Sequence, residues 1–217
     1  MASARTFDLP RIYPITDRRL SGLSHVEQAR QLIGAGARLI QLRDKHSTPA
    51  EFLAECRSVA ALARESGTTV IVNDRADIAL MAGAAGLHIG QDDLPPAAAR
   101  ELLGPGAVIG CSTHNVEQAI AAAAMPVDYI AIGPIFATAT KEDPDPVVGL
   151  EGLARVRASI GPEIALVAIG GIDRTNVAEV IAAGADSAAV IGRLYSGAGS
   201  IADNYKALAA AAMLLCT

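Results

Sequence analysis

A strict alternation of two kinds of segment constrains the fold of this chain more than any other feature. Eight short apolar runs have the character of buried strands, at 11–15, 38–43, 69–73, 86–89, 107–111, 128–132, 165–169 and 187–191. Ala- and Leu-rich amphipathic segments follow them in turn, at 25–35, 49–66, 76–83, 95–103, 115–124, 149–160, 175–183 and 202–214. This pattern predicts an α/β protein with a parallel sheet.

Such units assemble either as a closed barrel or as a doubly wound sheet, and an internal repeat with short connections favours the barrel. Segments 33–42, 81–90 and 181–190 each run from a helix end, through a Gly, into an apolar strand. The connections are short, and the chain has no long crossover at which a doubly wound sheet would reverse direction. We therefore expect a single (β/α)8 TIM barrel over residues 1–217, with 1–10 as an N-terminal extension.

Composition excludes several classes of function. The chain is 51% hydrophobic but only 3% aromatic, which suits parallel strands packed against Ala-rich helices. A formal net charge of −5 without a basic stripe argues against a nucleic-acid partner. No apolar stretch approaches the length of about 18 residues that a membrane span needs. We expect small-molecule partners, and a homo-oligomer stays open.

The cysteines and the first residues indicate a cytoplasmic protein. Cys56, Cys111 and Cys216 have no metal-binding spacing and are expected to be reduced thiols. Residues 1–11 contain no apolar run of the kind that follows the charges of a secretory signal.

Polar side chains gather after the predicted strands, whereas the opposite ends carry mostly Gly, Ala and a few solvated charges. In (β/α)8 barrels the loops that follow the strands form the active site. The positions concerned are Gln41, Arg43, Lys45, Asn73, Asp74, Asp92, Asp93, Ser112, Thr138, Thr140, Lys141, Gly170, Gly171 and Gly192. This asymmetry predicts a polar site at one mouth of the barrel.

The segment QLRDK (41–45) favours binding of a polyanion. Gln41 and Arg43 alternate along a strand and therefore point to the same side, and Lys45 continues that spacing. An amide, a guanidinium and an ammonium that converge would suit a diphosphate. The alternative is an ion pair with Asp44 at the rim.

Two acids follow neighbouring strands and favour a metal site. Asp74 and Asp93, or Asp92, are placed at strand ends about 5 Å apart by sheet geometry. Mg²⁺ takes one or two carboxylates and completes its shell with waters and substrate phosphates. The alternative is that Asp74 caps the following helix.

Other motifs add a phosphate turn but no general base. AIGGI (168–172) and VIG (190–192) lie where phosphate-binding barrels place Gly-rich turns. His25 and His46 are predicted at the surface, and His88 is predicted as a core or wall residue. His114 belongs to no Asp-His-Ser pattern.

Together, QLRDK, VNDRADIA, HIGQDDL, GCSTH, GPIFATATK and AIGGI resemble the thiamine phosphate synthase family, in order over nearly the whole chain. The resemblance implies a transferase that joins a pyrimidine-methyl diphosphate to thiazole phosphate, or to its carboxylated tautomer, and releases diphosphate. It implies Mg²⁺ as cofactor, bound by Asp74 and Asp93 in preference to Asp92.

The resemblance also implies roles for individual residues. Arg43, Lys141 and Ser112 would be catalytic. The residues implied to bind substrate are Gln41, Leu42, Arg43, Asp44, Lys45, Asn73, Ser112, Thr138, Ala139, Thr140, Lys141, Gly171, Ile191 and Gly192. Gly192 stands where the family often has Ser, so one hydroxyl contact to the thiazole phosphate is lost.

Three alternatives make different predictions. A related thiazole tautomerase should lack the diphosphate-binding residues of QLRDK and Asn73-Asp74, which are present. A sugar-phosphate isomerase should show an acid–base pair. A non-catalytic ligand sensor would have no need of residues that activate a leaving group.

Overall fold

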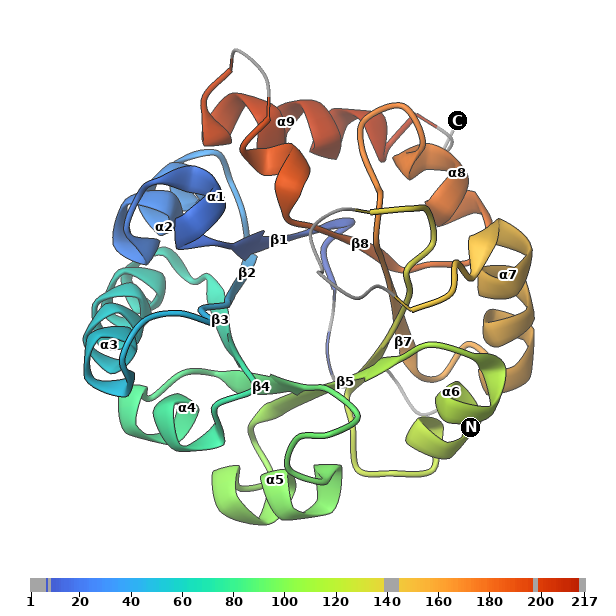
Figure 1. Ribbon diagram of the computed structural model, residues 1–217, viewed down its shortest axis with the longest axis horizontal. Helices are drawn as coiled ribbons and strands as arrows, with labels where there is room; N and C mark the ends of the chain where they lie inside the picture. The colour runs from blue at the N-terminus through green and yellow to red at the C-terminus, as the bar shows by residue number, and fades with distance from the viewer. Residues whose placement is uncertain (1–6, 8, 139–144, 197–198, 215–217) are drawn as a thin grey trace.

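Eight parallel strands close into a barrel in chain order, as predicted. The computed structural model describes residues 7, 9–138, 145–196 and 199–214. The strands are β1 (Ile12–Thr16), β2 (Leu39–Leu42), β3 (Thr69–Asn73), β4 (Gly86–Ile89), β5 (Val108–Thr113), β6 (Tyr129–Ile132), β7 (Ala165–Ile169) and β8 (Ser187–Val190). Pairing of β1 with β8 closes the ring (Figure 1).

Helices surround the barrel on the outside (Figure 1). They are α2 (His25–Gly34), α3 (Pro49–Ser66), α4 (Ala76–Ala82), α5 (Pro96–Leu103), α6 (Val116–Ala123), α7 (Gly149–Ile160), α8 (Val177–Ala182) and α9 (Ile201–Ala211). Ser24, Thr48 and Ser200 begin α2, α3 and α9 with capping boxes, which satisfy backbone N–H groups that a helix start leaves unpaired.

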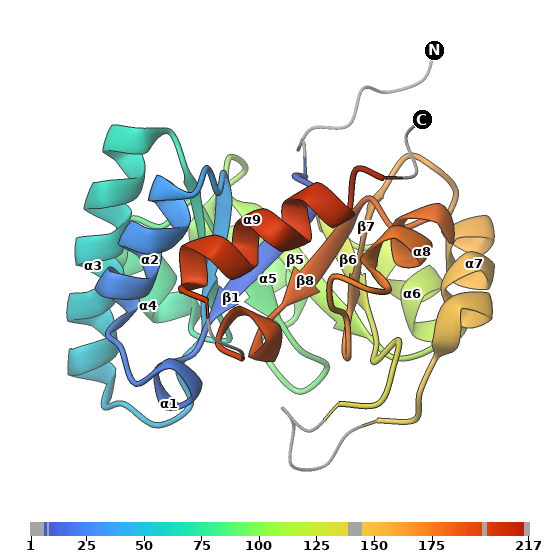
Figure 2. The same cartoon turned by 90° about the horizontal axis from the view of Figure 1, so that it is seen from above.

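Two short elements escaped the sequence analysis. Helix α1 (Arg18–Ser21) follows β1, and a 3-10 helix η1 (Gly192–Leu194) follows β8. Both are too short to show an apolar period, so pattern reading cannot detect them. In Figure 2, α1 lies at the end of the barrel to which the strands point. Among the described residues, no helix combines the length and the apolar character needed to cross a bilayer.

Side chains alternate between two separate cores because successive residues of a strand point to opposite faces. The larger core lies between the strands and the helices and includes Ile40, Leu42 and Ile130. The smaller core fills the barrel interior and includes Leu39, Tyr129 and Val167. Below the mouth the interior is therefore a packed core and not a pore.

Two similar ion pairs hold the opposite end, which we call the base of the barrel. Arg100 of α5 binds Asp128 with 2.7 Å between Nη2 and Oδ2, and Arg157 of α7 binds Asp186 with 2.5 Å between the same atoms. Each Asp also accepts a strand N–H, from Ile109 and from Leu166. The expectation that charges at this end are merely solvated is thus wrong for these two acids, which tie a helix to the start of a strand.

Candidate active site

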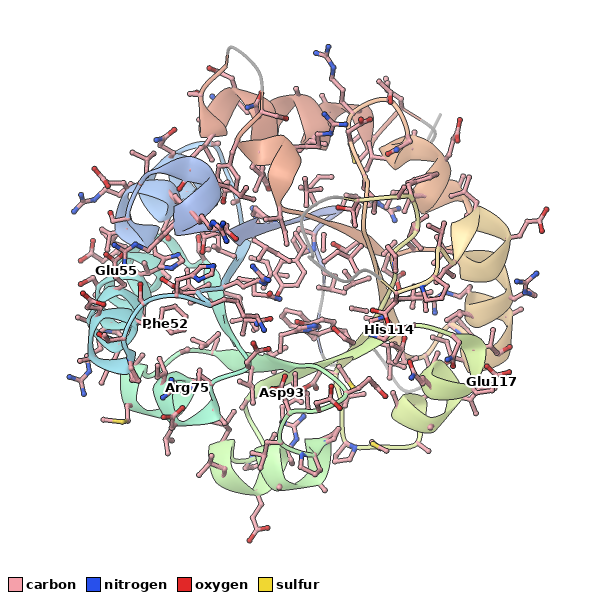
Figure 3. All side chains as sticks on the ribbon, viewed as in Figure 1. Phe52, Glu55, Arg75, Asp93, His114 and Glu117 are labelled. Carbon is pink, nitrogen blue, oxygen red and sulfur yellow. The ribbon has the colours of Figure 1, made fainter. Side chains whose placement is uncertain are left out.

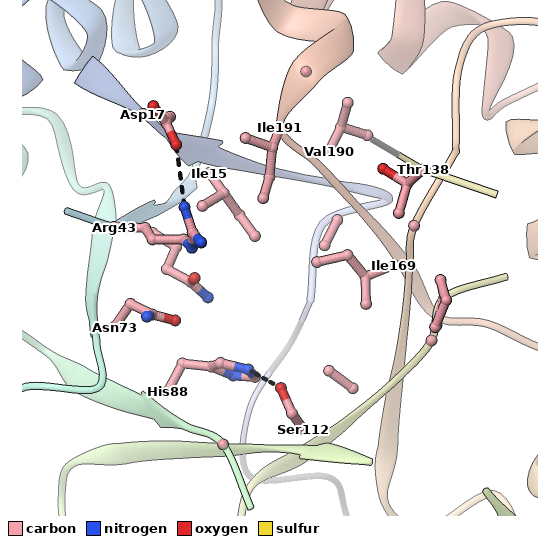
Figure 4. A pocket seen from close by; sticks show the side chains of 18 of the residues that line it. Ile15, Asp17, Arg43, Asn73, His88, Ser112, Thr138, Ile169, Val190 and Ile191 are labelled. Atoms are coloured by element: carbon pink, nitrogen blue, oxygen red, sulfur yellow. Dashed lines mark hydrogen bonds and ion pairs between the residues drawn. The ribbon is translucent and has the colours of Figure 1, made fainter. Parts of the chain in front are cut away.

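A large cavity opens at the mouth of the barrel, with a volume of about 1360 Å³. Its walls come from every strand end, and Figure 4 shows Arg43, Asn73, Ser112 and Thr138 facing the same space. The predicted site residues that line it are Gln41, Arg43, Lys45, Asn73, Asp74, Asp93, Ser112, Thr138, Gly171, Ile191 and Gly192. Asp92 also lines it. Ala139, Thr140 and Lys141 lie outside the described residues.

Two cations project from the end of β2. Strand pairing stops at Leu42, one residue before the predicted limit, but Arg43 and Lys45 still reach the cavity on the side of Gln41. The Arg43 Nη1 atom lies 3.1 Å from Asp17 Oδ2, and the Lys45 Nζ atom lies 2.7 Å from Asp74 Oδ2. Carboxylates therefore hold both cations in the cavity wall before any ligand arrives.

Asp17 is a site residue that the sequence analysis missed. Its Oδ1 atom accepts the Leu20 N–H and so begins α1, while Oδ2 binds Arg43. The signal was present, because Asp17 lies two residues after the first predicted strand (11–15), close to the kind of position that Asn73 and Asp74 occupy.

Leu42 and Asp44 point away from the cavity. Leu42 is fully buried in the core between strands and helices, so its side chain cannot contact a ligand there. Asp44 accepts the Ser47 hydroxyl at 2.7 Å and lies 3.2 Å from His25 Nε2. Burial raises the pKa of Asp44, but the Ser47 and His46 hydrogen bonds outweigh it and hold that pKa well below its usual range. The alternation along β2 explains both placements.

The prediction that His25 lies at the surface is wrong. His25 is fully buried, and its Nδ1 atom lies 2.7 Å from the Thr16 hydroxyl. Because Asp44 binds the other ring nitrogen, His25 joins the end of β1 to the loop that carries Arg43 and Lys45. Burial lowers the pKa of His25. His46 is exposed, as predicted.

Asp74 and Asp93 lie together at the rim, and Figure 3 places Asp93 on its inner side. Asp74 does not cap α4, where the structure gives no side-chain cap, and it has a left-handed φ of 63°. A non-Gly residue in this region is uncommon and is typical of functional sites. Partial burial, reinforced by the negative Asp74, raises the pKa of Asp93 above its ordinary value.

The chemistry of this acid pair is compatible with a divalent cation, and the Lys45 ammonium already lies 2.7 Å from Asp74. Two carboxylates at hydrogen-bonding range repel each other unless a proton or a cation lies between them. Within the described residues, no group of three or more His, Cys, Asp or Glu side chains converges. A cation here would therefore need further oxygen ligands from water or from a ligand phosphate, which is how Mg²⁺ is commonly held.

Glycine turns after β7 and β8 form the wall of the cavity opposite the acid pair. Gly170 and Gly171 have φ values of 102° and 65°, and a Cβ on Gly171 would lie 2.6 Å from Phe136 Cβ. Only Gly fits this close contact between the loops that follow β7 and β6. Arg193, after β8, lies 3.6 Å from Asp173. Glycine turns that line the cavity, together with a cation at this point, suit a phosphate.

The floor of the cavity contains polar groups that the sequence analysis did not single out. Tyr13 of β1 and Tyr129 of β6 meet at the barrel axis, with 3.1 Å between their hydroxyl oxygens. His88 lies beside them as a wall residue, as predicted, and its Nε2 atom lies 2.8 Å from the Ser112 hydroxyl (Figure 4). The tyrosines occupy inward positions of predicted strands, and this was the only signal available for them.

These features define a class: a (β/α)8 barrel with cations, an acid pair and glycine turns around one cavity at its C-terminal mouth. The chain belongs to the thiamine monophosphate synthase family, whose model matches residues 12–194. The relatives and the solved structure described next agree with this assignment.

Two relatives are named thiamine-phosphate synthase. The protein of Methanoregula boonei is 49% identical over 181 residues, which cover 83% of each chain. That of Koribacter versatilis is 48% identical over 194 residues, which cover 86% of this chain and 89% of the relative. The solved thiamine phosphate pyrophosphorylase of Pyrococcus furiosus superposes with a TM-score of 0.83 at 35% identity, covering 93% of this chain and 95% of that one.

Proposed function

We propose that this protein is a thiamine phosphate synthase, a transferase of thiamine biosynthesis that moves a pyrimidine-methyl group from its diphosphate to thiazole phosphate. The observation that carries the proposal is the placement of Arg43, Lys45, Asp74 and Asp93 around one cavity. The family, the relatives and the fold all agree with this activity.

The residues divide the cavity into two subsites. Arg43, Lys45, Asn73 and Ser112 would bind the pyrimidine diphosphate, with Gln41 fixed in the floor behind them. Thr138 would contact the thiazole, and the Gly171 and Gly192 turns would hold its phosphate. Lys141, with Ala139 and Thr140, completes the site by resemblance to the family.

The reaction needs charge neutralisation and no general base. The C–O bond breaks with its electron pair on the departing diphosphate, and the lone pair of the thiazole nitrogen then forms the new C–N bond. Mg²⁺ bound by Asp74 and Asp93 would neutralise charge on the diphosphate. Arg43 and Lys141 would donate hydrogen bonds to the same oxygens, more strongly as negative charge develops.

The proposal is tested by incubating the purified protein with both substrates and measuring thiamine phosphate and diphosphate. With Mg²⁺ present, thiamine phosphate and diphosphate should form in equal amounts. Both should fall to background when a chelator removes the Mg²⁺. Conversion of a carboxylated thiazole phosphate to its tautomer, without use of the pyrimidine diphosphate, would assign the chain to the tautomerase alternative instead.

A further inference from the structure

A chain of hydrogen bonds crosses the floor of the cavity from β2 to β5. The Gln41 amide nitrogen lies 3.1 Å from the Tyr13 hydroxyl, which lies 3.1 Å from the Tyr129 hydroxyl. The Tyr129 hydroxyl lies 2.9 Å from His88 Nδ1, and His88 Nε2 lies 2.8 Å from Ser112 Oγ. Four consecutive contacts thus connect a buried amide to a side chain of the cavity wall.

The packing leaves this chain little freedom to rearrange. The His88 and Tyr129 rings are stacked, with 18° between their planes, and Tyr13 meets Tyr129 edge to face at 79°. Gly110 makes room for the Tyr129 ring, because a Cβ there would lie 2.0 Å from Tyr129 Cζ. The two tyrosines and Gln41 are almost completely buried, so their side chains depend on one another for hydrogen-bond partners.

The amide at one end sets the direction of all the hydrogen bonds. An amide nitrogen only donates, so the Tyr13 oxygen accepts there. Within the described residues, the acceptor left for the Tyr13 proton is then the Tyr129 oxygen. The reverse order would strand the buried Tyr13 proton without an acceptor, which costs about 1–3 kcal/mol. Tyr129 therefore donates to His88 Nδ1.

His88 relays this direction to the cavity wall. A ring nitrogen that accepts a hydrogen bond carries no proton, so an imidazole that accepts at one nitrogen is neutral and carries its single proton on the other. Since Nδ1 accepts from Tyr129, that proton lies on Nε2 and is donated to Ser112 Oγ. Within the described chain, His88 is the protein partner of this hydroxyl, and Gln91 binds the Ser112 carbonyl at 2.5 Å.

We propose that the Gln41–Tyr13–Tyr129 chain fixes His88 as its Nε2–H tautomer, so that Ser112 accepts from His88 and turns its own proton into the cavity as a donor to the departing diphosphate. Tyr13, Tyr129 and His88 are then positioning residues, which act through Ser112. The identity of the anion rests on the proposed function, whereas the tautomer and the orientation of Ser112 do not.

The tautomer is measured on the substrate-free, full-length protein. Long-range ¹H–¹⁵N correlation spectra of histidine-labelled protein at neutral pH report which ring nitrogen carries the proton, and a His88→Gln sample assigns the signal. We expect protonated Nε2 and unprotonated Nδ1 for His88. A proton on Nδ1, or on both nitrogens, would overturn the proposal because Ser112 would then face the cavity as an acceptor or would lose its fixed direction.

Removing one hydroxyl tests the relay. Tyr129→Phe should give His88 a mixed tautomer signal and lower kcat roughly tenfold, with a smaller change in KM, as expected for lost support of a residue that contacts substrate. Tyr205→Phe is the matched control, since Tyr205 packs in the outer core on α9. An unchanged His88 spectrum in Tyr129→Phe would contradict the relay.

Substitution of His88 separates orientation from packing. His88→Gln can still donate to Ser112, whereas His88→Leu fills the space without a donor. We expect Gln to keep at least about tenfold more kcat than Leu. Equal losses would contradict a donor role. If the wild-type protein shows the Nε2–H tautomer but makes no thiamine phosphate, the proposed function fails while the proposal about the His88 tautomer stands.

Discussion

The base and the mouth of this barrel use charged residues in opposite ways. At the base, Asp186 accepts from Arg157 and from a strand N–H, so the acid is paired and connects two elements. At the mouth, Asp74 and Asp93 approach each other as like charges, and Asp74 has left-handed backbone. Charges at the base stabilise the fold. At the mouth, Asp74 already binds Lys45, but the two carboxylates still face each other, an arrangement suited to a cation that arrives with the ligand.

The comparison teaches how stability and activity are divided. Neutralising a mouth carboxylate should cost activity and little stability, and removing a base carboxylate should do the reverse. Loss of stability at the mouth, or loss of activity at the base, would contradict this division.

The largest effect is expected at the cationic side of the mouth. Arg43→Ala should raise the barrier by ~2–4 kcal/mol, seen as a fall of roughly 30-fold to 10³-fold in kcat, because a preorganised donor to the leaving group is lost. The side chain is partly exposed, so the free energy of unfolding should change little. Arg43→Lys, which keeps charge but not the two-pronged geometry, should lie between. Turnover of Arg43→Ala at the wild-type rate would refute the role.

At the base, Asp186→Ala should lower the free energy of unfolding by about 2–3 kcal/mol, because it leaves the half-buried Arg157 guanidinium without this carboxylate. Denaturant titration measures this, and kcat should stay at the wild-type value. Asp186→Asn, which can still accept the Leu166 N–H, should lose less. A loss of activity without loss of stability would show that the base also serves catalysis.

A smaller effect is expected at the acid pair, where one substitution should lower the rate and raise the stability. Asp93→Asn should lower the rate about tenfold and raise the Mg²⁺ concentration needed for half-maximal rate, because a cation ligand becomes weaker. Without Mg²⁺, the same change should raise the free energy of unfolding by about 0.5–1 kcal/mol, since it removes repulsion from Asp74. If the Mg²⁺ dependence stayed unchanged and the stability fell, Asp93 would support the fold and would not bind Mg²⁺.

The smallest effect concerns His25, which is buried at the mouth end of the barrel, behind the loop that follows β2. Its pKa is lowered in the folded protein by burial, against the opposing influence of Asp44 and Glu55 and with a small contribution from Arg18. The unfolded chain therefore binds a proton near pH 6.5, whereas the folded chain does not until lower pH. Stability from neutral His25 is complete above about pH 6.5 and is lost as pH falls below it.

Denaturant titrations at several pH values check this sign. Wild-type stability should decline as pH falls below about 6.5, with His88, whose pKa burial also lowers, contributing in the same direction, and His25→Gln should show a shallower slope. Asp44 titrates at far lower pH, so it does not contribute in this window. An identical slope in the variant would mean that other groups cause the decline.

Much of the fold was predictable because it depends on short-range patterns. Alternating apolar runs and amphipathic segments gave all eight strands, and β3, β4 and β7 match their predicted limits. Side-chain alternation also placed Gln41, Arg43 and Lys45 on one side, and the structure brings them to the same cavity. Helices α1 and η1 could not be predicted from the sequence, because they contain too few residues to show an apolar period.

The sequence by itself determined the barrel, the end at which polar groups collect and the family, since these follow from local periodicity and from ordered motifs. Only the tertiary structure decided which polar residues pair. In the folded protein, Asp44 binds the buried His25, and Asp17 binds Arg43. Hydrogen bonds through Tyr129 and His88 connect Tyr13 to Ser112. Such partners lie up to 116 residues apart along the chain, so their contact depends on barrel closure, which no local pattern encodes.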